Sequence, residues 1–239
     1  MIPWLNPGDP FPPAASALKD PNGLVCAGME LNAERVLMAY ERGIFPWYSD
    51  GQPVLWWSPD PRMVLQPKDF VLHRSLRKVL RNVAYEIRVD HNFTDVMRGC
   101  ADPRPEQDGT WITDEIVAAY SDLHHAGLAH SVECWMDHEL VGGLYGIALG
   151  KVFFGESMFM RRTDASKIAF AHLVAQLTDW GFELIDCQQK TDHLASFGAR
   201  PIARKDFLQR IERLIHSDAA VPRAGRWQFQ TDLRGAAPH

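Results

Sequence analysis

The chain has 239 residues, and its 25 Lys and Arg against 30 Asp and Glu give a formal net charge of −5 with His neutral. Hydrophobic residues make up 46% and charged residues 23%, a globular composition that excludes a disordered chain, a collagen and a coiled coil. The four cysteines form no CxxC pair, the N-terminus lacks a signal peptide and no uncharged apolar stretch could span a membrane, so we expect a cytoplasmic protein without a membrane partner.

Residues 1–66 hold many of the 16 prolines and half of the eight tryptophans. Proline fixes φ and removes a backbone donor, so we expect irregular structure here, with one helix over residues 32–42 that ends at Gly43. We interpret this stretch as a small Pro- and Trp-rich N-terminal domain, followed by a second domain over residues 67–239.

Regular periodicity begins after this stretch. It predicts helices over residues 73–82, 113–126, 165–180 and 204–216 and strands over residues 85–89, 129–136, 140–148, 151–159 and 182–188. Thr113 and Asp164 are the expected N-caps of two helices, and the tail after residue 216 is expected to be loose. Short connections between three consecutive strands favour an antiparallel meander, and the order strand, helix, strand over residues 151–188 favours a parallel pair. The sequence therefore predicts an α+β fold with a mixed sheet.

Familiar catalytic signatures are absent from the chain. It contains no GxxxxGK[ST] phosphate loop, no HExxH and no GxSxG nucleophile elbow. Gly142, Gly143 and Gly146 lie inside a predicted strand, which indicates a bulge or a close approach of backbone or ligand rather than a dinucleotide loop. The spacing of the histidines matches no standard metal site, so we expect no metal.

Asp186 and Gln188 form the most suggestive polar pair. Residues i and i+2 of a strand share a face, so both side chains should stand together at the C-terminal edge of the last predicted strand. A carboxylate beside a carboxamide can hold an amine and polarise a carbonyl; the alternative is that Asp186 caps a loop or pairs with Lys190. Glu156 lies on the neighbouring strand, and two acids in one cleft would favour a cationic substrate group.

Cys187 and His193 could instead form the nucleophile–base pair of a hydrolase. Strand alternation turns Cys187 to the face opposite Asp186 and Gln188, where a buried thiol without chemistry is the more common outcome. We therefore keep the hydrolase as an alternative that retained activity in a Cys187→Ala variant would dismiss.

Two groups of residues indicate a nucleic-acid ligand. The first is a basic helix face, a surface that binds phosphates but is more often only solvated. It consists of Arg74, Arg77, Lys78 and Arg81. The second is a set of loop aromatics, whose rings can stack on an unpaired base or seal an interface between domains. It consists of Trp47, Tyr48 and Trp111.

Eight segments between about Pro21 and about Leu208 carry a dense resemblance to one known family. They read PNGLVCAGMEL, AYERGIFPWYS, LWWSPDPRMVL, DGTWITDEIVAAY, HSVECW, LVGGLYGIALGKVFFGESMF, ASKIAF and FELIDCQQKTDHLASFGA. With these segments the chain resembles the leucyl/phenylalanyl-tRNA–protein transferases. The resemblance implies transfer of Leu or Phe from aminoacyl-tRNA to the N-terminal Arg or Lys of a protein, which marks that protein for degradation by the bacterial N-end rule pathway. It also implies a C-terminal domain similar to the acyl-CoA N-acetyltransferase fold, in agreement with the predicted strand order.

The resemblance further implies roles for single positions. The matching residues are Asp186 and Gln188 for the catalytic pair, Trp47 and Trp111 for the aromatics that hold the 3′-terminal adenosine, Leu144, Phe153 and Ile185 for the pocket around the Leu or Phe side chain, Glu156 for an acid near the reaction centre, and Arg74, Lys78 and Arg81 for tRNA binding. Residues 189–191 and Leu144, where Met is familiar, depart from the family pattern, which leaves the detailed shape of the pocket open.

An aminoacyl ester is already activated, so the implied reaction needs no ATP, CoA, metal or other cofactor. Asp186 would orient the attacking amine while Gln188 contacts the reacting carbonyl or relays a proton. We expect a monomer whose partners are charged tRNA and the acceptor protein.

Two alternative functions remain. A CoA-dependent N-acetyltransferase would need a glycine-containing phosphate loop, but residues 160–165 hold no glycine. A non-catalytic adaptor for tRNA or N-degrons would share the same features, and turnover would distinguish it.

Overall fold

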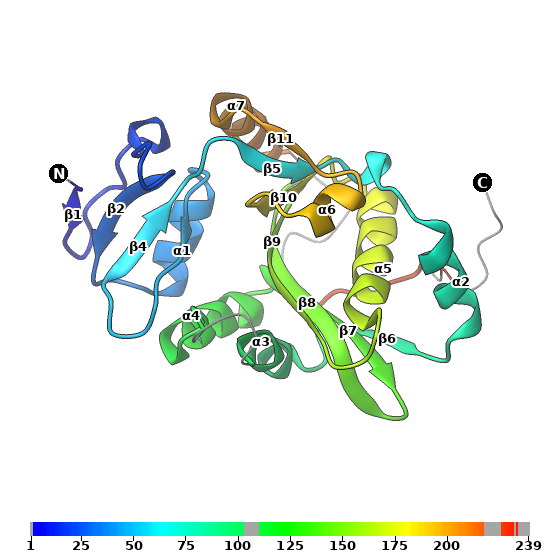
Figure 1. The fold of residues 1–239 in the computed structure, drawn as a ribbon. Coiled ribbons are helices and arrows are strands. Elements are labelled where there is room, and N and C mark those ends of the chain that lie inside the picture. The colour runs from blue at the N-terminus through cyan, green and yellow to red at the C-terminus, as the bar shows by residue number, and fades with distance from the viewer. Residues whose placement is uncertain (1, 103–109, 218–225, 232, 234–239) are drawn as a thin grey trace.

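The computed structural model describes residues 2–102, 110–217, 226–231 and 233, and it contains two β-sheets that lie side by side (Figure 1). The smaller sheet has four strands in the order β1-β2-β4-β3, and the larger has seven in the order β11-β5-β10-β9-β8-β7-β6. This small N-terminal part and mixed sheet confirm the predicted α+β class. Among the described residues, no helix is both long and apolar enough to cross a bilayer.

The smaller sheet forms from the proline-rich start of the chain. The elements of this part are β1 (Trp4–Leu5), η1 (Ala14–Ser16), β2 (Leu24–Gly28), α1 (Ala33–Tyr40), β3 (Phe45–Pro46) and β4 (Val54–Trp57). Asn32 caps α1 by accepting a hydrogen bond from the Arg35 N–H at 2.8 Å, and Gly43 follows the helix with φ +69°. The helix predicted over residues 32–42 is therefore confirmed. The strands are not among the predicted elements, because such short strands between prolines leave no alternating pattern.

The chain enters the larger sheet at β5 (Arg62–Leu65). This strand pairs antiparallel with both β10 (Leu184–Gln188) and β11 (Arg200–Ile202). The change from one sheet to the other therefore falls between Trp57 and Arg62. The domain boundary predicted at residue 66 lies one strand past this point.

The centre of the larger sheet is the predicted antiparallel meander. Its strands are β6 (Glu86–Val89), β7 (Ala129–Met136), β8 (Glu139–Leu149) and β9 (Val152–Met160). Helix α5 (Ala165–Asp179) then leads to β10, which lies parallel to β9, so the predicted strand–helix–strand unit is also confirmed. Gly146 lies at a register shift between β8 and β9, where a Cβ would be 2.3 Å from the Phe154 carbonyl oxygen. The close backbone approach predicted for a strand glycine is thus present.

The two predicted N-caps have different outcomes. Thr113 caps α4 (Asp114–His125) as expected, because its Oγ1 accepts a hydrogen bond from the Ile116 N–H at 3.3 Å. Asp164 stands at the N-cap position of α5, but its φ is +65° and no backbone N–H donates to its side chain. The side-chain cap predicted for Asp164 is wrong, because the carboxylate pairs with Lys167 Nζ at 2.6 Å instead.

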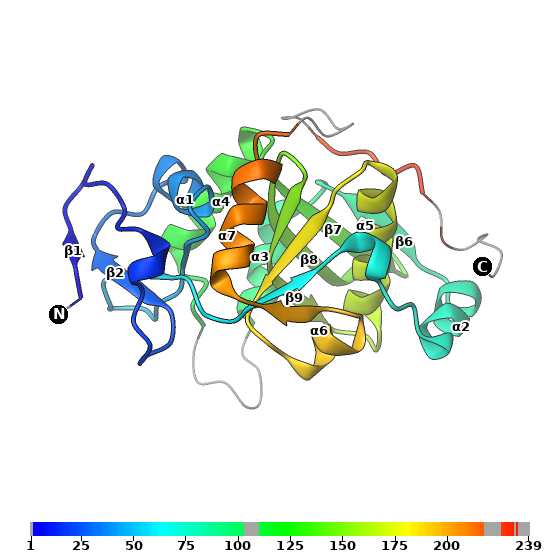
Figure 2. The same cartoon turned by 90° about the horizontal axis from the view of Figure 1, so that it is seen from above.

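Helices cover both faces of the larger sheet, and α1 and α2 lie at opposite ends of the molecule (Figure 2). Helix α5 packs on one face, with α2 (Arg74–Asn82) beyond it, while α4 and the unpredicted α3 (Phe93–Ala101) pack on the other. The remaining elements are η2 (Pro67–Asp69), α6 (Asp192–Ser196) and α7 (Arg204–Leu214). One buried cluster holds Trp56 of the smaller sheet and Phe154 of the larger sheet, so the two parts of the chain share a core.

The described part of the C-terminal tail is packed, whereas a loose tail is predicted after residue 216. Trp227 is 5% exposed, and its ring stacks on that of His130 with centroids 3.7 Å apart. The prediction is wrong for residues 226–231, because the large aromatic ring at 227 is stabilised by burial. Residues 218–225 and 234–239 lie outside the described residues.

Candidate functional site

The candidate site lies where β9 and β10 separate. Their parallel pairing ends with Asp186 opposite Phe154, although β9 continues to Met160. A cavity of about 540 Å³ lies at this point, at the C-terminal edge of the two parallel strands, where open sheets commonly bind ligands. Eight of the predicted site residues line it, namely Trp47, Trp111, Leu144, Phe153, Glu156, Ile185, Asp186 and Gln188.

One end of the cavity is apolar. Phe153 on β9 and Ile185 on β10 are directly opposite one another in the sheet register, so they share the face that α5 covers. Leu144 adds to this wall from β8. Helix α5 contributes Phe170 and Leu173, which the sequence places on a buried stripe without showing what that stripe contacts. This end can accept an aliphatic or aromatic side chain.

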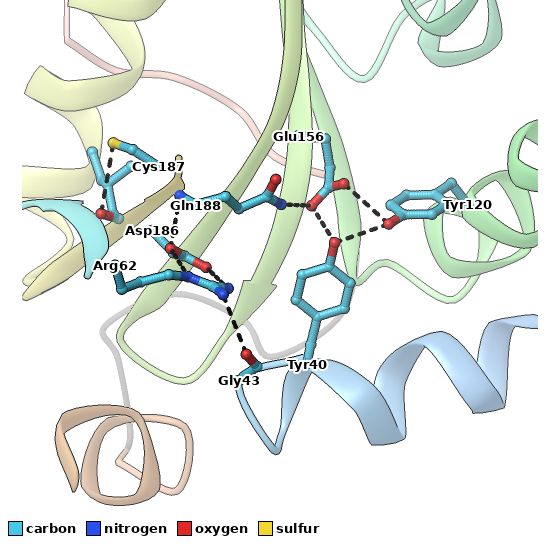
Figure 3. A network of polar contacts seen from close by, with 9 residues as sticks. Tyr40, Gly43, Arg62, Tyr120, Glu156, Asp186, Cys187 and Gln188 are labelled. Atoms are coloured by element: carbon cyan, nitrogen blue, oxygen red, sulfur yellow. Dashed lines mark hydrogen bonds and ion pairs between the residues drawn. The ribbon is translucent and has the colours of Figure 1, made fainter. Parts of the chain in front are cut away.

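The other end of the cavity is organised around the Glu156 carboxylate (Figure 3). Gln188 Nε2 donates to Oε1 at 3.1 Å, Tyr120 Oη donates to Oε2 at 3.0 Å and Tyr40 Oη donates to Oε1. Burial raises the pKa of Glu156 to about 7, and the two tyrosine hydrogen bonds oppose this rise because they stabilise the carboxylate. The group can therefore gain or lose a proton near neutral pH.

Tyr40 and Tyr120 are site residues that the sequence does not reveal as such. Tyr40 ends α1, Tyr120 lies on α4, and their hydroxyls are 2.9 Å apart. Burial is the largest cause that raises the pKa of each phenol well above its usual range, so both stay protonated donors. The sequence gives only an indirect sign of this role, because a tyrosine on the buried face of a helix must form a hydrogen bond with some polar partner.

Asp186 belongs to the cavity wall, but its carboxylate is buried in a pair with Arg62. Arg62 donates Nε–H to Oδ1 at 2.8 Å and Nη2–H to Oδ2 at 2.7 Å, and both side chains are 0% exposed. A bidentate guanidinium compensates the aspartate charge, so Asp186 does not pair with Lys190. Among the described residues that line the cavity, this leaves Glu156 as the acid that can bring a negative charge to the cleft. The geometry therefore does not support the expectation that Asp186 contacts a substrate amine directly.

Gln188 is held in an unusual backbone conformation. Its φ is +58°, at a register shift between β10 and β5, and its N–H donates to Asp186 Oδ1 at 2.9 Å. A non-glycine residue in this region costs roughly 1–3 kcal/mol and persists only where its surroundings fix it. Asp186 and Gln188 reach the same side of the sheet, as predicted, and the buried aspartate fixes the turn that directs the Gln188 amide to Glu156.

Two of the three predicted loop aromatics border the cavity. Trp47 is 42% exposed and lies against Trp57, with ring centroids 5.7 Å apart, and Trp111 is half-buried. Both rings can therefore meet a ligand that enters the cavity. Tyr48 does not, because it is buried with its hydroxyl 3.4 Å from Thr113 Oγ1. Stacking of Tyr48 on a base, one of the two predicted alternatives, is not possible in this arrangement.

The predicted basic helix is confirmed as α2, but its charges lie away from the cavity. Leu76 and Leu80 face the core, and the basic side chains are exposed. The exposed residues are Arg74, Arg77, Lys78 and Arg81. The structure thus offers a separate cationic surface rather than a continuation of the cavity wall.

The geometry does not favour a Cys187–His193 hydrolase. Cys187 packs into the core on the α5 side, opposite Asp186, as strand alternation predicts. Burial raises the pKa of its thiol, so little thiolate forms near neutral pH. The thiol contacts the Ile185 carbonyl oxygen at 3.9 Å, and burial lowers the pKa of His193.

Comparison with known sequences identifies related proteins over nearly the whole chain. The family description "Leucyl/phenylalanyl-tRNA protein transferase" matches residues 64–212, and that of its N-terminal domain matches residues 29–60. Leucyl/phenylalanyl-tRNA–protein transferase from Nitrosospira multiformis is 59% identical over 229 residues, which cover 96% of this chain and 97% of the relative. The protein of the same name from Chromobacterium violaceum is 58% identical over 215 residues, which cover 90% and 92%.

Similarity to solved structures is more distant. A GCN5-related N-acetyltransferase from Kribbella flavida aligns with 15% sequence identity and a TM-score of 0.38. The alignment covers 70% of this chain and 60% of that protein. L-PGS from Bacillus licheniformis aligns with 12% identity and a TM-score of 0.37, over 72% of this chain and 57% of that one.

Proposed function

Because the chain belongs to the leucyl/phenylalanyl-tRNA–protein transferase family, we propose that it transfers Leu or Phe from aminoacyl-tRNA to the N-terminal Arg or Lys of an acceptor protein. The modified protein would then be marked for degradation by the N-end rule pathway. One observation carries the proposal: a single cavity combines an apolar end, two bordering tryptophans and the Glu156–Gln188 pair. The enzyme would act as a monomer in the cytoplasm, where charged tRNA is available.

The aminoacyl end of the tRNA would occupy the cavity in a defined direction. The Leu or Phe side chain enters the apolar end formed by Leu144, Phe153 and Ile185, which supplies a hydrophobic driving force. The 3′-terminal adenosine lies between Trp47 and Trp111, where stacking contributes roughly 1–3 kcal/mol per base. The ester carbon then lies between these two ends, near Gln188.

The reaction requires a neutral amine and a place for its proton. A free α-amino group has a pKa of about 7.7–8.0, so part of it is neutral at pH 7–8. Gln188 Oε1 accepts a hydrogen bond from the attacking amine, while its Nε2–H remains on Glu156. As the N–C bond forms and the C–O ester bond breaks, the Glu156 carboxylate takes a proton from the nitrogen and passes the same proton to the leaving ribose oxygen, which returns Glu156 to its carboxylate form. Positioning of the two reactants supplies much of the acceleration.

Asp186 acts in this scheme as a positioning residue. Its carboxylate fixes the Gln188 backbone and is itself fixed by Arg62, so it sets the direction of the Gln188 amide without contacting substrate. Exposed Arg74, Lys78 and Arg81 on α2 would bind tRNA phosphates outside the cavity. The preference for Arg or Lys acceptors rests on the family resemblance, with a negative Glu156 as a compatible feature.

The test incubates the protein with leucyl-tRNA and a peptide that begins with Arg or Lys, and measures the peptide mass. A gain of one Leu residue is expected, together with no gain for a matched peptide that begins with Ala. Binding of both ligands without a mass gain would indicate an adaptor and overturn the proposal. Calorimetry with acetyl-CoA provides a second arm, in which saturable binding would favour the acetyltransferase instead.

A further inference from the structure

The apolar end of the cavity is supported from behind by the C-terminal segment. Phe153 lines the cavity and also packs against Trp227, whose ring centroid is 6.0 Å from that of Phe153 at an interplanar angle of 38°. Both rings belong to the buried cluster on the α5 side of the sheet. Trp227 therefore contacts the cavity wall without lining the cavity.

The Phe153 ring cannot move away in the direction of β8. It lies over Gly146, where a Cβ would come within 2.5 Å of the Phe153 Cζ atom. The β8 backbone at this glycine thus limits the ring on one side. With the β8 side closed, the Phe153 ring also packs against the large Trp227 ring, which does not line the cavity.

Trp227 is fixed in its place by a buried anchor. Its backbone N–H donates to Asp90 Oδ2 at 2.9 Å, and its ring stacks on His130 with centroids 3.7 Å apart and an interplanar angle of 7°. His130 Nδ1 lies 2.8 Å from the same carboxylate oxygen. A few residues on, the N–H groups of Gln230 and Thr231 donate to Gln176 Oε1 at 2.7 and 3.0 Å. The segment is therefore attached at Trp227 itself and again three and four residues later.

From this geometry we infer that Trp227 is a specificity-determining residue, which sets the size of the accepted amino-acid side chain by limiting the position of Phe153. The inference rests on the proposed function, because it assumes that Phe153 contacts the transferred Leu or Phe. A smaller side chain at 227 lets the Phe153 ring recede and deepens the apolar end. The larger substrate gains contacts from this change, and Leu loses them.

The test compares Trp227→Ala and Trp227→Phe with the unaltered protein. The kcat/KM values are measured for leucyl-, phenylalanyl- and tryptophanyl-tRNA with one Arg-initiated peptide. In Trp227→Ala we expect the Phe-to-Leu ratio to rise about tenfold, the scale of a methylene-sized change in an apolar pocket, and transfer of Trp to become measurable. Trp227→Phe should change the ratio in the same direction by less, and it decides the outcome if the alanine variant does not fold.

Two further variants separate the possible outcomes. Trp4→Ala removes an exposed tryptophan of β1 and should leave the ratio unchanged. Phe153→Leu enlarges the cavity directly and should raise the ratio. A wild-type ratio, or an equal loss for all substrates, in the Trp227 variants would overturn the inference while a changed ratio in Phe153→Leu upholds the pocket. An unchanged ratio in Phe153→Leu as well would overturn the placement of the Leu or Phe side chain in the proposed function.

Discussion

Two neighbouring strands of the cavity wall each carry a carboxylate, Asp186 fully buried and Glu156 half-buried, and the two differ in the groups that contact the carboxylate oxygens. On β10, Asp186 has a bidentate guanidinium partner, so the pair can remain charged without exposure to water. On β9, Glu156 has hydroxyl and amide donors and no ion pair with a cation in the part of the chain that the structure describes, and burial raises its pKa to about 7. The difference shows that the partner of a buried acid, more than its burial, decides whether it serves as a fixed support or as a proton acceptor.

The largest expected effect comes from removing the Arg62 guanidinium, which pairs with the buried Asp186 carboxylate. Arg62→Ala leaves a buried carboxylate without its cation, so the free energy of unfolding should fall by about 3–5 kcal/mol in urea titrations. As a control, Arg213→Ala removes the exposed pair with Glu183 and should cost no more than about 1 kcal/mol. The double variant Arg62→Met, Asp186→Leu should recover much of the stability. A loss below about 1 kcal/mol in Arg62→Ala would contradict the role of Asp186 as a compensated charge.

Removal of the proton acceptor should affect turnover and its pH dependence. With Glu156→Gln we expect kcat/KM to fall about 100-fold, the lower end of general-base contributions. In the unaltered protein kcat/KM should rise with pH through about 7, because the carboxylate form increases. This step should disappear in the variant, whereas the rise from the acceptor amine, with a pKa of about 7.7–8.0, should remain. Glu212→Gln, an exposed change on α7, is the matched control. Retention of the step near pH 7 in Glu156→Gln would assign it to another group.

Removal of one tyrosine hydroxyl tests whether the hydrogen bonds to Glu156 set the pKa of its carboxyl group. The Tyr120 hydrogen bond stabilises the Glu156 carboxylate and lowers its pKa, so Tyr120→Phe should move the activity step upward by roughly one pH unit. Tyr40→Phe should act in the same direction. The pH profile of kcat/KM measures both shifts. A downward shift in either variant would show that the hydroxyl does not stabilise the charged form.

The smallest expected effect belongs to charges outside the cavity. Lys78→Ala removes one exposed cation of α2, so KM for charged tRNA should rise a few-fold and the slope of log K against log salt should decrease by about 1. Lys19→Ala, an exposed lysine in the N-terminal part, is the control. Equal behaviour of the two lysine variants would remove α2 from the tRNA surface.

The sequence predicts those features that depend on neighbouring residues. The Thr113 cap, the meander and the parallel β9–β10 pair all follow from local periodicity and short connections. The partner of Asp186 is 124 residues away, on a strand that proline-rich surroundings conceal. A pattern can place Asp186 and Gln188 on one face, but it cannot tell which carboxylate acquires a guanidinium.

The sequence pattern also does not show which side chains become buried by residues far away in the chain. Glu156 reads as an acid near a reaction centre, yet the pKa of about 7 arises from being enclosed by Tyr40, Tyr120 and the rest of the core, which no single segment specifies. Trp227 is a similar case, because its contacts with His130 and Phe153 join parts of the chain that are far apart in sequence. Asp164 shows that a local pattern can also mislead. Aspartate is a common N-cap residue, but the Asp164 carboxylate pairs with Lys167, three positions later, and does not cap the helix.

The contact between Tyr40 and Glu156 joins residues 116 positions apart, one from each part of the chain. The proton acceptor is therefore completed only when the first helix has docked, and a fragment that begins after Trp57 would carry the Gln188 amide beside an acid with an altered proton affinity. The N-terminal part cannot be exchanged as an independent module for that of an unrelated protein. Any such graft would have to supply a phenol at the same place.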